Sequence, residues 1–168
     1  VDRLNIEPHQ LGSVEALREV PGFLNAFFLA LIIRFAPSKV AAIALVVMGI
    51  GIAAYSEISS VYLLAIFSVV WSLGFHCWIP LEQSMGLSYS PRGDKGRWLG
   101  QLRSIHSLAW LVAIGLCMAL LEHLRYEGIF VLAGVCTAVG GLALLFIDRS
   151  EKEPVEKGLV LKRRYLLY

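Results

Sequence analysis

Three charged residues near the beginning of the sequence, Glu15, Arg18 and Glu19, are spaced so that one face of a helix carries all of them. Arg18 stands one helical turn after Glu15, and opposite charges at that spacing form an ion pair. In a helix that crosses a membrane, a cation between two carboxylates could close an outer gate through ion pairs. The alternative is an ordinary helix end whose long side chains extend toward water.

Four further residues, Trp71, Gly74, Trp78 and Glu82, fall on one stripe of a helix because three or four positions separate each from the next. A small residue between two indoles, with a carboxylate beyond them, could form the wall of a pocket for a small solute. An aromatic stripe at this spacing is also typical of a helix core. Both interpretations remain open.

Glu82 and Arg103 lie on either side of a polar segment and at similar depths in the two apolar stretches that flank it. At ~1.5 Å per residue, Glu82 is about 7.5 Å from a helix end near Leu87, and Arg103 is about 9 Å from a helix start near Arg97. Either charge alone would be unfavourable in lipid. We therefore predict an ion pair between Glu82 and Arg103 on neighbouring antiparallel helices.

His76 and His106 also lie at similar depths, about 16 Å and 13.5 Å from the same helix ends. A histidine at such a depth could relay protons, because histidine changes charge near neutral pH; a buried, hydrogen-bonded histidine is the alternative. His76 is about 120° around the helix from Glu82. The two histidines therefore meet in one site only if the helix bends, as Pro80 would allow.

The sequence offers little to an enzyme. It has no Gly-rich phosphate loop after a strand, no serine, histidine and acid set, and no H-E-x-x-H segment. Haem ligation by two histidines would need imidazoles that face each other, and nothing else in the sequence supports it. We expect no catalytic residues, no metal site and no cofactor.

The elements that position these residues follow from the composition. Hydrophobic residues make up 57% of the chain, charged residues only 17%, and the mean hydropathy is +0.68. A water-soluble core could not bury so much apolar surface, whereas polytopic membrane proteins have this composition. The net charge of +2 is too small to indicate a nucleic-acid partner. Cys77, Cys117 and Cys136 lie within apolar runs and are expected to be small buried side chains rather than disulfides.

Five stretches reach or approach the roughly 20 apolar residues that a membrane-spanning helix needs. The predicted fold class is therefore all-α, a polytopic transmembrane helix bundle within residues 1–147. Ser13 is the expected N-cap of the first helix, and Pro80 is expected to kink the third. The predicted spans are about 11–35, 39–55, 61–87, 97–121 and 128–147.

The number of Lys and Arg residues is alternately high and low in successive connections between these spans. In membrane proteins the loops rich in Lys and Arg lie on the cytoplasmic side. We therefore expect a multi-pass protein of the cell (inner) membrane with its N-terminus outside and its C-terminus in the cytoplasm. Residues 148–164 form a predicted charged cytoplasmic linker, and residues 165–168 begin a further apolar segment. The basic residues are Arg34 and Lys39 after the first span, none after the second, Arg92, Lys95, Arg97 and Arg103 around the third connection, Arg125 in the fourth, and Arg149, Lys152, Lys157, Lys162, Arg163 and Arg164 in the tail.

Small residues recur at four-residue spacing in two of the predicted helices. Gly49 and Ala53 form one such pair, and Gly134 and Ala138 form another. Faces of this kind let helices approach closely in lipid.

This layout resembles a major facilitator superfamily (MFS) transporter, from just after the first helix to the end of its N-terminal half. In that family the short inner loop after the second helix carries a glycine, aspartate and basic signature. Arg34 and Lys39 keep the basic positions here, whereas Ile33 and Ala36 stand where aspartate and glycine are usual.

A second likeness lies in the segment R-G-D-K-G-R-W-L-G, which runs from Arg92 to Gly100. Arg92, Gly93, Gly96 and Arg97 of this segment, together with Arg34 and Lys39, are the residues that we call the inner-loop motif. It is similar to the arginine and glycine entry into the fifth helix of these carriers.

The resemblance implies a permease, a secondary active transporter that moves a small solute by alternating access. Its partners would be the lipid bilayer, a small-molecule solute, a first helix missing before Val1 and the C-terminal half of the same carrier. The candidate transport pathway comprises Trp71, Trp78, Glu82, Arg103, His76 and His106. The alternative is a small non-transporting five-span membrane scaffold that acts through helix partners.

Overall fold

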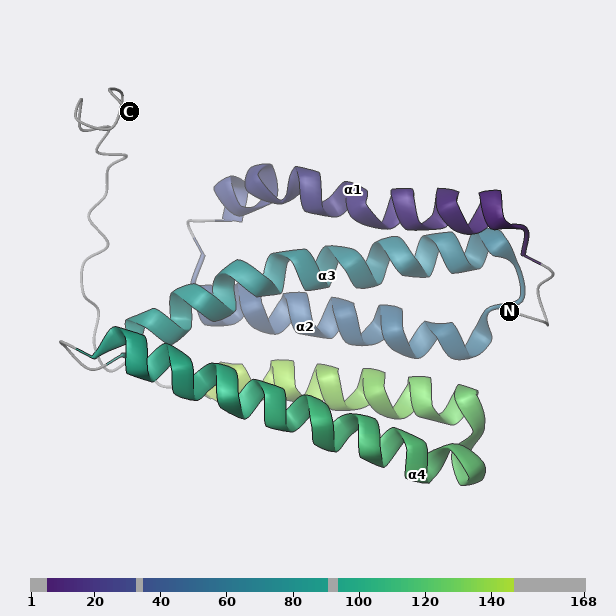
Figure 1. The fold of residues 1–168 in the computed structure, drawn as a ribbon. Helices are drawn as coiled ribbons and strands as arrows, with labels where there is room; N and C mark the ends of the chain where they lie inside the picture. Colours follow the sequence, from purple (N-terminus) through teal and green to yellow (C-terminus); the bar gives the residue numbers. More distant parts are fainter. Residues whose placement is uncertain (1–5, 33–34, 91–93, 147–168) are drawn as a thin grey trace.

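A computed structural model describes residues 6–32, 35–90 and 94–146 of the chain, and within these ranges it contains helices and no strand (Figure 1). The predicted linker at 148–164, the segment at 165–168 and the residues Arg34, Arg92 and Gly93 lie outside the described ranges. The helices are α1 (Pro8–Ile32), α2 (Pro37–Ala54), the short η1 (Tyr55–Glu57), α3 (Val61–Ser88), α4 (Lys95–Ala143) and the short η2 (Leu144–Phe146).

The start of α1 is set by a proline and a glutamine rather than by the predicted serine cap. Pro8 occupies the first helical position, where its fixed φ favours the helix and its missing N–H is not needed. The backbone N–H of Glu7 donates to the side-chain oxygen of Gln10 at 3.0 Å, so that one otherwise unpaired donor is satisfied. Ser13 lies inside the helix and donates to the carbonyl of His9 at 2.9 Å. The prediction that Ser13 caps this helix is therefore wrong.

The bounds of α2 and α3 follow local signals. Pro37 starts α2, and Ser60 caps α3 by accepting a hydrogen bond from the backbone N–H of Leu63 at 3.3 Å. α3 begins at Val61 as predicted and continues to Ser88 with Pro80 inside it.

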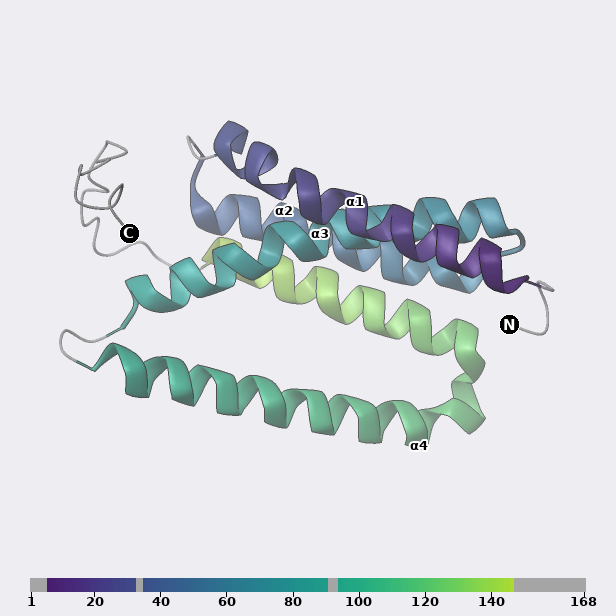
Figure 2. The same cartoon turned by 45° about the horizontal axis from the view of Figure 1, so that its top comes forward.

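The long helix α4 consists of two arms that meet at Arg125. This residue has a φ of 54° and a ψ of 179°, outside the helical region, and the chain turns back there (Figure 2). We call residues 95–124 the first arm and residues 126–143 the second arm. The break falls within the connection that the sequence predicts between 121 and 128.

α2 lies at the centre of the packing and contacts both α3 and the second arm of α4, while α1 packs on α3 (Figure 1). Where α2 meets the second arm, a Cβ added at Gly49 would lie 2.5 Å from the carbonyl oxygen of Gly134 and 3.1 Å from the Cβ of Ala138. Gly134 in turn lies against Ala53. We call these four residues the small-residue seam. The sequence indicated that each pair could form a close helix contact, and in the structure the two pairs meet each other.

The first arm of α4 has few neighbours. Near its start, the indole N–H of Trp98 donates to the carbonyl of Gly86 at 2.8 Å, and Leu102 lies against the same glycine. Every residue from 100 to 119 is exposed, large apolar side chains such as Trp110 and Leu111 included. Figure 2 shows this arm standing apart from the other helices. It therefore presents apolar faces that nothing in the described ranges covers.

Among the described residues, three helical segments, 37–57, 61–88 and 95–146, are long and apolar enough to cross a membrane. α1 falls short because every 18-residue window within it contains Glu15, Arg18 and Glu19. The two arms of α4 count as one segment because the helix runs through the break at Arg125.

Candidate functional site

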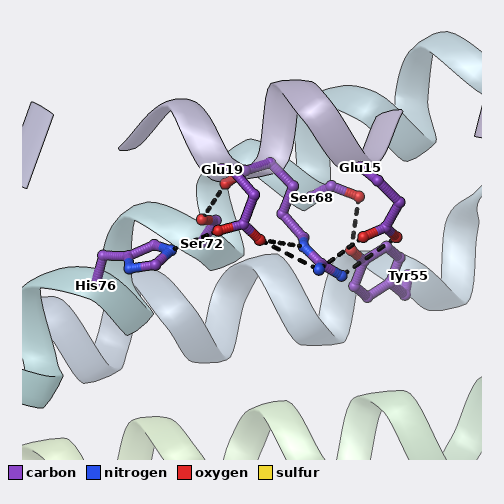
Figure 3. Close-up of polar contacts among 7 residues, drawn as sticks. Glu15, Glu19, Tyr55, Ser68, Ser72 and His76 are labelled. Carbon is purple, nitrogen blue, oxygen red and sulfur yellow. Dashed lines mark hydrogen bonds and ion pairs between the residues drawn. The ribbon is translucent and has the colours of Figure 1, made fainter. Parts of the chain in front are cut away.

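A cluster of charged side chains on α1 forms the first part of the site. The guanidinium of Arg18 lies 2.6 Å from a carboxylate oxygen of Glu15 and 3.3 Å from one of Glu19, so it bridges both carboxylates (Figure 3). A second nitrogen of Arg18 donates to Glu15 at 3.2 Å, which makes that pair bidentate. The ion pair predicted from helical spacing is therefore present.

α3 faces this cluster with a row of polar side chains at four-residue spacing. Ser72 is fully buried and donates to the backbone carbonyl of Arg18. One turn later, the imidazole Nε2 of His76 lies 3.7 Å from Glu19 Oε2, a contact that becomes an ion pair when the imidazole is protonated. One turn earlier, the buried Ser68 shares a hydrogen bond of 2.8 Å with the hydroxyl of Tyr55 (Figure 3).

Trp71 lies beside these polar groups and adds a cation–π contact. The guanidinium of Arg18 is 5.5 Å from the centre of the indole ring, within the range of such contacts. Phe75 stacks with Trp71 at a ring separation of 5.3 Å. Arg18 thus interacts at once with carboxylates on its own helix and with an aromatic ring on α3. We call the contacts among Glu15, Arg18, Glu19, Trp71, Ser72 and His76 the polar seam.

A glycine makes room for the histidine of the polar seam. A Cβ added at Gly22 would lie 2.9 Å from the His76 ring, closer than real Cβ contacts. Farther along α1, the side-chain oxygen of Asn25 is buried without a hydrogen-bond partner among the described residues. Polar residues therefore continue along this face of α1 from Glu15 to Asn25.

The aromatic stripe of α3 does not form one pocket wall. Gly74 packs closely against the backbone of Ala44 and Met48 on α2, and the backbone of Trp71 meets Gly51 of α2. Trp78 is half-buried on the same helix. This side of the stripe is therefore a helix contact, whereas the Trp71 ring belongs to the polar seam.

Glu82 lies opposite a histidine rather than the predicted arginine. Glu82 Oε1 is 3.7 Å from Nδ1 of His106, while Arg103 is exposed and makes no ion pair in the described ranges. The prediction compared only the depths of Glu82 and Arg103 along their helices. It did not include the direction in which each side chain points around its helix axis. Trp98, Leu102 and His106 follow at four-residue steps on the face toward α3, and Arg103 is turned from Leu102 by about 100°.

The two candidate histidines therefore belong to separate places. His76 contacts α1, and His106 contacts the later part of α3. The remaining inner-loop residues lie near helix starts: Lys39 is in the first turn of α2, Gly96 is in the first turn of α4 with open space around it, and Arg97 is 3.9 Å from Asp94. No group of three or more metal-binding side chains occurs within the part of the chain that the structure describes.

Sequence reasoning missed Gly22, Tyr55, Ser68 and Ser72. The signal was available in part, since Ser68, Ser72 and His76 recur every four residues and so share one helix face. Their pairing with α1 could not be read from spacing.

Comparison with known protein families decides the family of the chain. The sequence profile described as Major Facilitator Superfamily matches residues 2–166, nearly the whole sequence. The chain belongs to the Major Facilitator Superfamily. As a member of this family with long apolar helices, it is a multi-pass membrane protein, and the family points to transport rather than to enzyme catalysis.

One curated relative of this superfamily member comes from Deinococcus radiodurans and is named "Putative sugar efflux transporter". It is 34% identical over 71 residues, which cover 42% of this chain and 18% of the relative. The chain therefore spans less than a fifth of the relative's length in this match. No solved structure matched the chain.

Proposed function

We propose that the chain is the N-terminal part of a secondary active transporter that moves a small solute across the cell (inner) membrane by alternating access. Family membership over residues 2–166 carries this proposal. In alternating access, two helix bundles rock about a site near the middle of the bilayer. The chain described here supplies helices for one such bundle.

In this proposal the helices cross the membrane five times. α1 supplies a span despite its three charges, because Arg18 pairs with both carboxylates and also lies over the Trp71 ring of α3. The reversal at Arg125 supports counting the two arms of α4 separately. The distribution of Lys and Arg supports an N-terminus outside and a C-terminus in the cytoplasm.

The polar seam is the proposed outer gate, extended from Glu15, Arg18 and Glu19 to their partners on α3. Polar groups inside a membrane protein tend to face the bundle interior or a water-filled path. Trp71 and His76 belong to this seam, while Glu82 and His106 mark a second polar contact toward the proposed inner end. Trp78 and Arg103 complete the proposed pathway set.

The exposed first arm of α4 supports the proposal that further helices of the same carrier complete the bundle. Beyond Leu102, large apolar side chains such as Leu108, Trp110 and Leu111 are exposed in the described ranges. We place a first helix against this arm and the C-terminal half beyond it.

Solute uptake by the complete protein in proteoliposomes tests the function. The panel includes sugars because the Deinococcus radiodurans relative is named for sugar efflux. Each solute is measured with and without a pH gradient, beside protein-free liposomes and a variant, Arg18→Gln, that breaks the proposed gate. Uptake above both controls for at least one solute class is expected. Uptake equal to that of empty liposomes for the whole panel would favour the alternative, a non-transporting membrane scaffold.

A further inference from the structure

A cavity of about 390 Å³ lies between α1, α2 and α3, on the side where α1 ends and α2 begins. Phe28 of α1, Ile43 and Val47 of α2, and Leu73 and Cys77 of α3 line it. Its volume is within the range of ligand-binding pockets. The cavity opens on a different face of α3 from the one that carries Ser72 and His76, so it is separate from the polar seam.

Apart from Lys39, the residues that line this cavity are apolar. A solute rich in hydroxyl groups, such as a sugar, would lose its hydrogen bonds to water there and gain none from the protein. A hydrocarbon chain loses nothing on entry and buries apolar surface. The cavity is therefore suited to a ligand other than a polar transported solute.

One cation stands at the mouth of the cavity. Lys39, in the first turn of α2, contributes to the lining and is exposed. A lysine stem can follow apolar surface while its ammonium group stays in the polar boundary region. Phe35 and Ile43, each 65% exposed, lie among the lining residues and make the rim apolar. The chemistry that fits has a hydrocarbon chain and an anionic head.

We infer that this cavity binds one acyl chain of an anionic membrane phospholipid, with the lipid headgroup at Lys39. The chain is a multi-pass membrane protein, so this ligand reaches the cavity directly from the bilayer. Anionic lipids of the cytoplasmic leaflet attract basic residues next to the membrane. The assignment to that leaflet rests on the proposed orientation, whereas the apolar lining and the lysine do not.

Photo-crosslinking of the complete protein in lipid nanodiscs tests the site. The probe is phosphatidylglycerol with a diazirine in one acyl chain, and crosslinked positions are mapped by mass spectrometry. Phosphatidylcholine with the same acyl probe and a free diazirine fatty acid form the other two arms. Crosslinks from phosphatidylglycerol should concentrate on residues 28, 35–47 and 73–77. Even labelling of all lipid-facing helices would overturn the proposal, as would labelling by the free fatty acid alone.

Two variants separate the cavity from its mouth. Val47→Trp fills the cavity and should remove most crosslinks at its lining, while Ile66→Trp, on the exposed surface of α3 and outside the lining, should leave them unchanged. Lys39→Gln should lower the preference for phosphatidylglycerol over phosphatidylcholine by about fivefold, the effect of one basic residue at an anionic membrane surface. Lys95→Gln is its control, because Lys95 is exposed at a helix start and does not line the cavity.

Ile43→Trp provides a second filling variant, since Ile43 is exposed and tolerates a larger side chain even if Val47→Trp fails to fold. Unchanged crosslinking in folded Ile43→Trp protein would also overturn the proposal. None of these measurements requires transport. If the protein takes up no solute but shows the expected crosslinks, the proposed function is contradicted and the lipid site is supported. If the protein takes up solute but shows no such crosslinks, the lipid site is contradicted and the proposed function is supported.

Discussion

The small-residue seam between α2 and α4 and the polar seam between α1 and α3 join helices by opposite means. In the first, Gly49 and Gly134 bring two backbones into direct contact, with no side chain between them. In the second, the long side chain of Arg18 reaches two carboxylates and an aromatic ring. Backbone contact is close and short-ranged, whereas charged side chains can find new partners when helices shift.

This difference predicts which helices move together. Backbones that touch cannot slide without a clash, because packed interfaces deform little. The side chains of Glu15 and Glu19 are 49% and 51% exposed, and in the proposed outer gate water would replace their ion pairs at modest cost. We infer that α2, α3 and the second arm of α4 form a rigid unit, and that α1 is the helix whose contacts can rearrange.

The largest effect is expected from breaking the small-residue seam. In Gly134→Leu, the new side chain would occupy space held by Gly49 and Ala53, so α2 and the second arm must separate. Overpacking of this kind destabilises proteins by about 3 kcal/mol. The measurement is the midpoint of thermal unfolding in detergent, followed by the tryptophan signal.

Gly140→Leu is the matched control for this prediction. Gly140 lies on the same arm of α4, and a Cβ added there would meet nothing within 4 Å, so the same change should alter stability by less than about 0.5 kcal/mol. If both variants lower the stability equally, the loss comes from placing leucine anywhere on this arm and not from the contact between Gly134 and α2.

A smaller loss of stability is expected from a substitution at Gly22, the glycine that makes room for His76 in the polar seam. Gly22→Ala places a Cβ against the His76 ring, and the imidazole must move away from Glu19. The obstacle is a side chain that can rotate rather than a backbone, so the cost should be about 1 kcal/mol. Gly12→Ala, on the same helix and in open space, should be neutral or slightly stabilising. If Gly22→Ala lowers the stability more than Gly134→Leu does, the polar seam and not the small-residue seam is the more rigid contact.

Removal of the guanidinium in Arg18→Gln should change stability by less than about 1 kcal/mol, because its carboxylate partners are about half exposed and face water in the proposed gate. If the polar seam is a gate, Arg18→Gln should clearly lower the rate of solute uptake although the protein stays folded. Arg18→Lys should restore uptake only in part, since an ammonium cannot bridge two carboxylates and stack on Trp71 as a guanidinium does.

Arg125→Gln is the control for that comparison, because Arg125 lies outside the proposed pathway and forms an exposed pair with Glu127 at 3.9 Å. It should change neither stability nor uptake. If Arg125→Gln impairs uptake as strongly as Arg18→Gln, general loss of positive charge explains both results.

Local features of the fold were predictable from the sequence because they depend on neighbours along the chain. The start of α3 at Val61 and the pairing of Arg18 with Glu15 follow from local signals and helical spacing. The small residues of α2 and of the second arm of α4 indicated faces suited to close packing, but not that these two faces meet each other. The start of α1 was misjudged, because Pro8 and Gln10 outweighed the serine that follows them.

Contacts between distant helices were not predictable in the same way. The partner of Glu82 depends on how far the first arm of α4 is rotated, and depth along a helix does not reveal rotation. The contact of His76 with Glu19 requires α1 and α3 to lie side by side although α2 separates them in sequence. Such pairings are decided by the packing of whole helices.

The smallest expected effect comes from a single hydrogen bond, and it tests whether the polar seam is held by charge or by the backbone. Ser72→Ala removes the bond to the carbonyl of Arg18 from a fully buried position. Hydrogen bonds between helices in membranes contribute about 0.6 kcal/mol on average. Ser104→Ala, which removes an exposed bond of 3.0 Å within one helix, should have almost no effect. If Ser72→Ala costs more than Arg18→Gln, α1 is anchored to α3 by its backbone, and its charged side chains are then free to exchange partners without releasing the helix.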